Sequence, residues 1–107
     1  MESFSNRAKG FEAEFTRKQE QAFRVTARRN KLFGLWAAAR LGLPAGDAAQ
    51  AYAMTVVEAD FEAPGDDDVI RKVLADFADK GIAVTEAELR TELARAEAEA
   101  RTQLSAS

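Results

Sequence analysis

The stretch ARRNKLFGLWAA, residues 27–38, places three cations and an asparagine directly before an apolar segment that contains the single tryptophan. Phe33 and Trp36 lie three positions apart, and a run of alanines, 37–39, follows them. Residues at this spacing share one face of a helix, and small alanines let a neighbouring helix approach closely. The stretch therefore predicts one helix of a small bundle.

The same helix carries two kinds of side chain. We expect Phe23 to extend the core seam that Phe33 and Trp36 begin. Arg28, Arg29 and Lys31 fall where long cationic side chains can pair or reach outward while their stems cover apolar surface.

Glycine and proline divide the rest of the chain into helical segments. They cluster at 42–46 and 64–65, and Gly81 stands alone. Neither residue supports a continuing helical hydrogen-bond ladder, so helices end there. Four helices are expected, at about 20–42, 47–62, 66–80 and 85–104.

Each of the last three segments has a start signal and an apolar stripe. Asp47 precedes the second, the aspartates 66–68 open the third, and Thr85 with Glu88 forms a capping box for the fourth. The expected stripes are Ala49, Tyr52, Val56 and Val57; then Val69, Ile70, Val73, Leu74 and Phe77; then Leu89, Leu93, Ala96 and Ala100. Short connections favour antiparallel neighbours. The fold class predicted is all-α, a four-helix bundle.

The first nineteen residues differ from the rest. Phe4, Phe11 and Phe15 are spaced seven and four apart and share one helical face. Serines, Asn6 and Gly10 nevertheless weaken the helix, and short isolated helices are marginal in water. We expect 1–19 to be a mobile N-terminal arm that orders on docking, and 20–107 to be the bundle domain. The alternative is a simple extension of the first helix that packs on its own bundle.

Composition excludes much chemistry. The chain has 47% hydrophobic and 31% charged residues, with no cysteine and no histidine. Disulfides, thiol and imidazole catalysis and Cys/His metal sites are therefore ruled out. No phosphate loop, signal peptide or apolar run of membrane-spanning length is present. We expect a cytoplasmic protein that is not an enzyme and needs no cofactor or metal.

The acidic stretch DFEAPGDDD, residues 60–68, invites comparison with a calcium-binding loop. Counting from Asp60 places Gly65 at the required sixth position. Pro64, however, falls on the fifth position, and Arg71 replaces the bidentate glutamate at the twelfth. A capped helix start explains the acids better.

Charge is unevenly distributed along the chain. Residues 1–43 hold nine lysines or arginines against four glutamates, and 44–107 hold six against fourteen acids, within a net charge of −3. On the first helix, Arg17, Arg24, Arg28 and Lys31 share a face. Arg24, Arg28 and Lys31 could contact a nucleotide or phosphate, which gives a nucleotide-binding bundle, or a nucleic-acid accessory protein, as alternative functions. A solvated face paired with acids of the later helices is favoured, and no nucleic-acid partner is expected.

Three segments resemble a known family, the ζ-subunit ATPase inhibitors of α-proteobacterial F-type ATP synthases. They are FRVTARRNKLFGLWAA (23–38), AYAMTVVEADFEAPGDDDVIRK (51–72) and, more loosely, FSNRAKGFEAEF (4–15). Together the tryptophan segment and the acidic segment are quite specific, whereas the last helix, rich in Ala and Glu, is not. The resemblance spans most of the chain.

The resemblance implies a four-helix bundle with an inhibitory arm. In that family the arm enters the interface of the α, β and γ subunits of the catalytic sector, folds there as a helix, and blocks rotation mainly in the hydrolysis direction. Carried over to this sequence, the residues that would contact ATP synthase are Phe4, Arg7, Phe11, Glu12 and Phe15. The protein would lie in the cytoplasm, peripheral to the membrane-bound enzyme, without inserting in the membrane. Weak binding of ATP or ADP belongs to the alternative reading, in which the basic face of the first helix senses a nucleotide.

Overall fold

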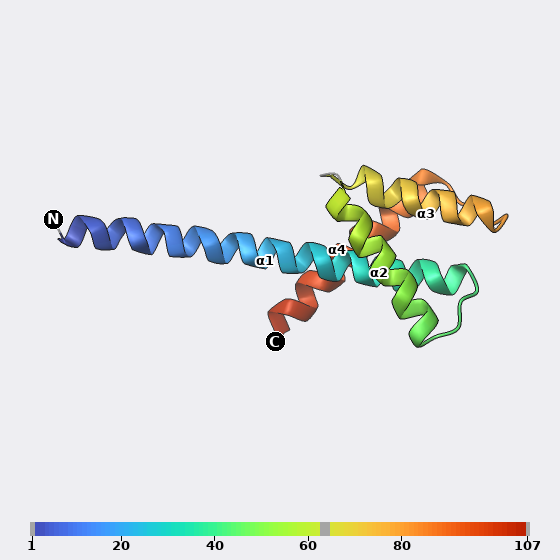
Figure 1. Ribbon diagram of the computed structural model, residues 1–107, viewed down its shortest axis with the longest axis horizontal. Helices are drawn as coiled ribbons and strands as arrows, with labels where there is room; N and C mark the ends of the chain where they lie inside the picture. The colour runs from blue at the N-terminus through green and yellow to red at the C-terminus, as the bar shows by residue number, and fades with distance from the viewer. Residues whose placement is uncertain (1, 63–64, 107) are drawn as a thin grey trace.

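The computed structural model consists of four helices joined by short connections (Figure 1). It describes the backbone of residues 2–62 and 65–106, and the side chains of 18–61 and 65–105. The helices are α1 (Glu2–Arg40), α2 (Asp47–Glu62), α3 (Asp67–Asp79) and α4 (Glu86–Ala106). No strand occurs among the described residues, so the all-α class is confirmed.

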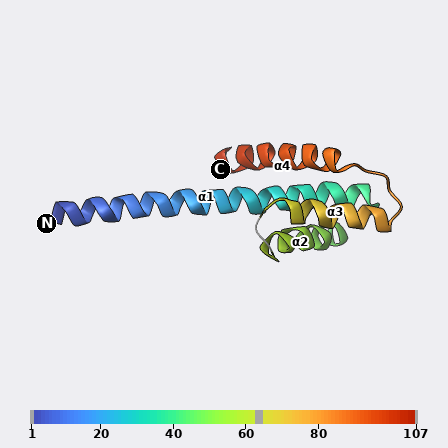
Figure 2. The same cartoon turned by 90° about the horizontal axis from the view of Figure 1, so that it is seen from above.

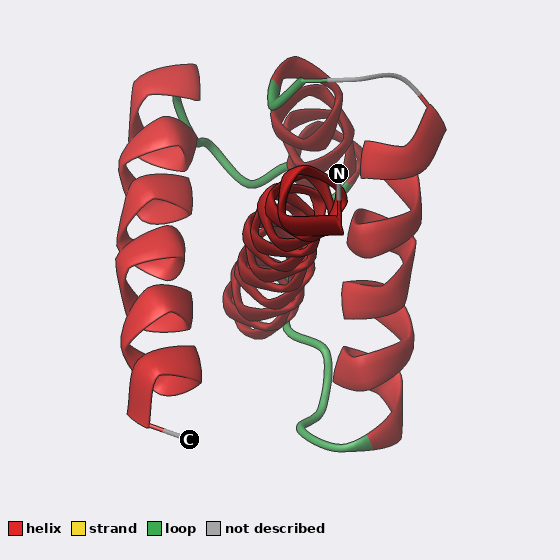
Figure 3. Cartoon of the chain, turned by 90° about the vertical axis from the view of Figure 1, so that its left-hand side faces the viewer, coloured by secondary structure: helices red, strands yellow, loops and turns green. Residues whose placement is uncertain are grey.

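Helix α1 lies at the centre of the bundle. Helix α4 packs on one side of it, and α2 and α3 lie on the other (Figure 2). Seen from the N-terminal end of α1, the other three helices surround it on three sides (Figure 3). The N-terminal part of α1 continues beyond the bundle, which gives the molecule extents of 65 × 26 × 21 Å.

The start of the first helix differs from the sequence expectation. A helix was expected from about residue 20, whereas α1 is a single helix of 39 residues from Glu2. Starting a helix is costly but extending one is not, so the weak formers Asn6 and Gly10 can join a helix that packing has already fixed downstream. The division into an arm at 1–19 and a bundle at 20–107, and the mobility of the arm, stay predictions.

The other three helices begin and end within two residues of their predicted bounds. The Thr85 hydroxyl accepts a hydrogen bond of 3.1 Å from the backbone N–H of Glu88, as expected for the capping box. Asp66 was expected to cap α3 with its side chain, and this is wrong. Its carboxylate makes no capping bond.

The core forms where the predicted stripes meet. All thirteen stripe residues of α2, α3 and α4 are buried or half-buried. Phe33 and Phe77 are fully buried, and the half-buried Trp36 ring stacks on both, with centroid distances of 5.8 and 6.0 Å. Phe23, however, was expected in this seam and is 57% exposed. Its ring contacts Phe61 of α2 and is not part of the core cluster.

Helices α1 and α2 approach closely through small residues. Gly34 is buried against Ala53, and a Cβ atom at position 34 would lie 2.7 Å from the Ala53 Cα. Ala37 and Ala38 are fully buried, as expected for close packing, whereas Ala39 is exposed. Glycine is therefore needed at position 34 because the backbone of Ala53 leaves no room for a side chain, and not because of unusual torsion angles.

A buried arginine connects three parts of the bundle. Arg29 was expected to point outward, and this is wrong, because it is only 5% exposed. Its guanidinium donates to the Asp66 carboxylate at 2.9 Å and to the side-chain oxygen of Asn30 at 2.9 and 3.1 Å, and lies 3.7 Å from Glu97 of α4. Asp66 therefore binds α1 instead of capping α3. The charge is tolerated inside because it is hydrogen-bonded on several sides.

Candidate protein interface

The residues predicted to contact ATP synthase lie on the projecting part of α1. The backbone of Phe4, Arg7, Phe11, Glu12 and Phe15 belongs to the helix, and their side chains lie outside the described residues. The helical backbone keeps the spacing of seven and four that aligns the three phenylalanines along one side. The projection itself is clear in Figure 1.

The predicted phosphate-contacting cations do come together. Arg24, Arg28 and Lys31 are all exposed and line one groove of about 410 Å³. Helix α1 contributes most of its lining, and α2 and the C-terminal end of α4 contribute the rest. Its remaining lining residues are Phe23, Ala27, Met54, Val57 and Leu104. We call it the α2-side groove.

The cations of the α2-side groove have no acidic partner among the described side chains. The sequence favoured a cationic face paired with acids of the later helices, but within the described side chains none of Arg24, Arg28 and Lys31 forms an ion pair. Arg28 instead donates a 3.0 Å hydrogen bond to the side-chain oxygen of Gln103, which is neutral. The expected solvated face is confirmed, because all three cations are exposed, whereas the expected ion pairs do not occur among the described side chains.

Large apolar side chains lie beside these cations. Phe23, Met54 and Phe61 are 57%, 49% and 65% exposed, and they are the large hydrophobic residues most exposed among the described side chains. The rings of Phe23 and Phe61 contact each other, with centroids 5.9 Å apart. Exposed aromatic and methionine side chains gathered in one place are typical of protein-binding surfaces.

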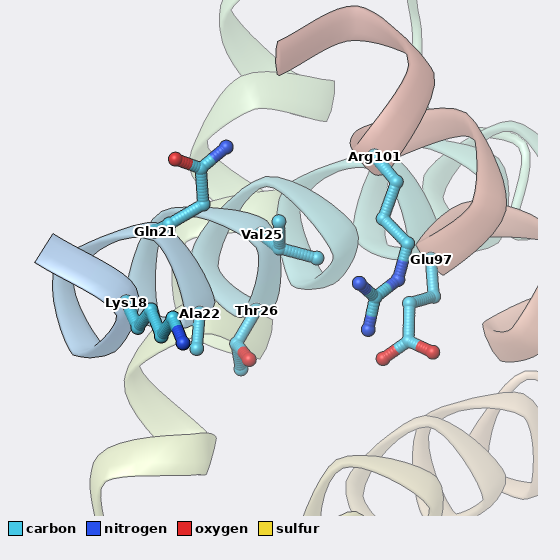
Figure 4. Close-up of a pocket in the computed structure, with 7 residues that line it drawn as sticks. All are labelled: Lys18, Gln21, Ala22, Val25, Thr26, Glu97 and Arg101. Carbon is cyan, nitrogen blue, oxygen red and sulfur yellow. The ribbon is translucent and has the colours of Figure 1, made fainter. Parts of the chain in front are cut away.

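A second groove, of about 390 Å³, lies on the opposite flank of α1, towards α4 (Figure 4). Its lining residues are Lys18, Gln21, Ala22, Val25, Thr26, Glu97 and Arg101. Figure 4 shows Glu97 and Arg101 reaching from α4 towards the α1 side chains. We call it the α4-side groove. It combines both signs of charge and lacks a large exposed hydrophobic residue, so it is less suited to an anion or to an apolar partner.

Groups with shifted pKa values lie away from both grooves. Partial burial and a 2.8 Å hydrogen bond to Asp76 raise the pKa of the Tyr52 phenol far above its usual value. The hydrogen bond from Arg90, at 2.8 Å, lowers the pKa of the Asp67 carboxyl. Both interactions join one helix to another. Their role is therefore structural rather than catalytic.

Two further features bear on the class of site. Among the described residues, no three acidic side chains gather closely enough to hold a metal ion. None of the described helices is long and apolar enough to cross a membrane. What the described surface offers is a projecting helix with an apolar, cationic groove at its base, an arrangement typical of a small helical protein that binds other proteins.

The comparison with known families fits this class. The chain belongs to the family described as ATPase inhibitor subunit zeta, whose model matches residues 1–103. Membership supports a regulatory role as an inhibitor of ATP synthase and implies an interaction with that enzyme. A search of curated protein sequences found no significant match.

Sequence reasoning missed the apolar half of the α2-side groove. Met54 and Phe61 lie on α2 but outside its buried stripe, and Phe23 was assigned to the core. A usable signal was present, because large apolar residues off the stripe of an amphipathic helix must face solvent or a partner. The buried Arg29 gave no such signal, since a lone cation looks the same in sequence whether it is exposed or paired inside.

Proposed function

We propose that this protein inhibits ATP hydrolysis by F-type ATP synthase, and that it does so by inserting the N-terminal part of α1 into the interface of the α, β and γ subunits. The observation that supports this most directly is the projection of α1 beyond the bundle. The sixteen residues from Glu2 to Arg17 span about 24 Å as a helix, enough to reach from an enzyme's surface into an internal interface.

Within this proposal the arm residues have distinct tasks. Phe4, Phe11 and Phe15 anchor the helix in apolar pockets, as aromatic hot spots do. Arg7 and Glu12 set its orientation through charge pairs, which contribute more to specificity than to affinity. The proteins that receive the arm are the α, β and γ subunits, and the inhibitor needs no cofactor.

The bundle acts as a stop in this mechanism. Its two shorter dimensions, 26 and 21 Å, are well above the 10–12 Å diameter of a single helix, so an interface that admits the arm would exclude the bundle. Insertion would then end where α2 and α4 meet α1. The protein would remain in the cytoplasm, on the periphery of the membrane-bound enzyme.

The test is the rate of ATP hydrolysis by the purified cognate ATP synthase, titrated with the full chain and with Phe11→Ala. We expect saturable inhibition by the full chain. Loss of one aromatic anchor should weaken it by about thirtyfold, equivalent to roughly 2 kcal/mol of binding. Arg24→Glu is the control, and it should change inhibition much less. Inhibition that is unaffected by Phe11→Ala but lost with Arg24→Glu would contradict arm insertion.

A further inference from the structure

The α2-side groove has the features of a second binding surface, separate from the arm. We propose that it docks an acidic amphipathic helix supplied by a partner protein, with the apolar face of that helix against Phe23, Met54 and Val57 and its carboxylates facing Arg24, Arg28 and Lys31. The inference goes beyond the proposed function, because no residue of the predicted arm lines this groove.

The large apolar side chains in and beside the α2-side groove are exposed to solvent. Met54 and Phe23 keep about half of their surface in solvent, and Phe61 extends the apolar area through its contact with Phe23. The intramolecular core does not need these side chains, since they lie outside the buried cluster. An apolar surface of this kind gains free energy when a partner covers it.

The positive charge of the α2-side groove favours an acidic partner. Three cations line the same groove, and no carboxylate belongs to its lining. Within the described side chains, several acids of α3 and α4 pair with other cations, for example Asp68 with Arg71 and Glu92 with Arg95. A cationic rim beside apolar walls complements a helix that carries glutamate or aspartate beside its leucines.

The lining of the groove favours a helix as the partner. Its α1 residues, at positions 23, 24, 27, 28 and 31, recur every three or four residues and so form a stripe along α1. A partner helix laid along this stripe meets it with side chains at the same spacing. A single small anion would use the cations but leave Met54 and Phe23 uncovered.

The opposite flank of α1 provides an internal comparison. The α4-side groove has a similar volume but includes Glu97 beside Arg101 and Lys18, so its charge is mixed. It should therefore not select an acidic helix. Arg101 is exposed, like Lys31, and serves as the matched control position.

The experiment measures binding of synthetic helix-stapled peptides of about fifteen residues to the full chain by fluorescence anisotropy. The first peptide has leucines at helical spacing flanked by glutamates. In the second the glutamates are replaced by glutamine, and in the third by lysine. We expect saturable binding of the glutamate peptide, about tenfold weaker binding of the glutamine peptide, weakening with added salt, and no binding of the lysine peptide.

Three variants locate the binding surface. Met54→Asp and Lys31→Glu should each weaken binding of the glutamate peptide at least about tenfold, because they place a negative charge in the groove. Arg101→Glu should leave binding unchanged. All three side chains are exposed, and circular dichroism confirms that each variant folds.

Several outcomes would overturn the inference. They are absence of saturable binding by the glutamate peptide, binding of the lysine peptide as well, or an equal loss with Arg101→Glu. Displacement of the peptide by ATP with tighter binding of the nucleotide would assign the cations to a nucleotide. Self-association of the chain that Met54→Asp abolishes would assign the groove to a second copy. Because none of these readouts uses ATP hydrolysis, their failure leaves the proposed arm insertion untouched.

Discussion

At the scale of single residues, close contacts inside the bundle depend on residues that do not stand out in the sequence. Gly34 is one. Glycine in a helix interior normally costs about 1 kcal/mol relative to alanine, so an exposed Gly→Ala change would be expected to stabilise. Here the added methyl group would meet the backbone of Ala53 at 2.7 Å.

Gly34→Ala is therefore expected to destabilise the bundle by about 1–3 kcal/mol, because α2 must move away from α1 to admit the methyl group. Urea unfolding followed by circular dichroism measures the change. A gain in stability of about 1 kcal/mol would instead show that the α1–α2 contact is looser than described.

Arg29 is a second such residue. Arg29→Ala removes the packed stem and leaves the side-chain oxygen of Asn30 without its donor, so we expect a loss of about 2–3 kcal/mol. The control is Arg95→Ala, which breaks only an exposed pair with Glu92 and should cost less than about 1 kcal/mol. Equal effects in urea unfolding would mean that burial of Arg29 contributes nothing.

Tyr52 should make the free energy of unfolding depend on pH in the alkaline range. Its pKa is raised in the folded state, so the folded protein holds the phenol proton more tightly than the unfolded chain. The resulting stability is fully present below the unfolded pKa, about 10, and is lost as pH rises above it. Tyr52→Phe should lessen the decline in unfolding free energy between about pH 9 and 11, relative to the native chain. Identical slopes for the two chains would contradict the raised pKa of the Tyr52 phenol.

At the scale of helices, the last three could be predicted almost completely from the sequence, and the first could not. Glycine and proline mark where α2 and α3 end, capping signals mark where α3 and α4 begin, and the apolar spacing of all three helices fixes which face is buried. The start of α1 depends instead on whether a helix that is packed downstream extends through residues of low helix propensity. The free-energy differences involved are small, so helix propensity alone does not predict where the helix begins. The exposure of Phe23 depends on where the other helices stop covering α1. Only the three-dimensional arrangement shows this.

The candidate sites, too, could be predicted only in part from the sequence. The spacing of Arg24, Arg28 and Lys31 was enough to predict that they share a face, because a helix repeats every 3.6 residues. The absence of carboxylate partners among the described side chains, and the presence of Met54 in the same groove, could not be predicted. Both depend on which parts of α2 and α4 lie across from α1.

The projecting part of α1 yields a prediction about motion. Helical segments without tertiary packing are marginal in water, so we expect backbone amides of residues 2–17 to show lower order parameters than those of 20–104 in the free protein. Nuclear magnetic resonance relaxation measures this directly. Uniform rigidity along the whole of α1 would contradict a docking arm that orders on binding.

At the scale of the whole molecule, the bundle has a core of its own and the first part of α1 extends away from it. The core cluster is built from residues between Phe33 and Ala96, so we expect the fold not to depend on the first part of α1. Removal of that part should leave the bundle intact while it removes the proposed inhibitory contact. Fold and function can therefore be tested independently.

The most direct measurement is hydrolysis by the cognate ATP synthase titrated with a chain that lacks Met1 to Thr16, beside the full chain. If the arm inserts, the truncated chain should not inhibit at concentrations where the full chain inhibits completely. Its circular dichroism should still show a folded helical bundle with an unchanged melting transition. Full inhibition by the truncated bundle would contradict arm insertion and would place the inhibitory contact on the bundle itself.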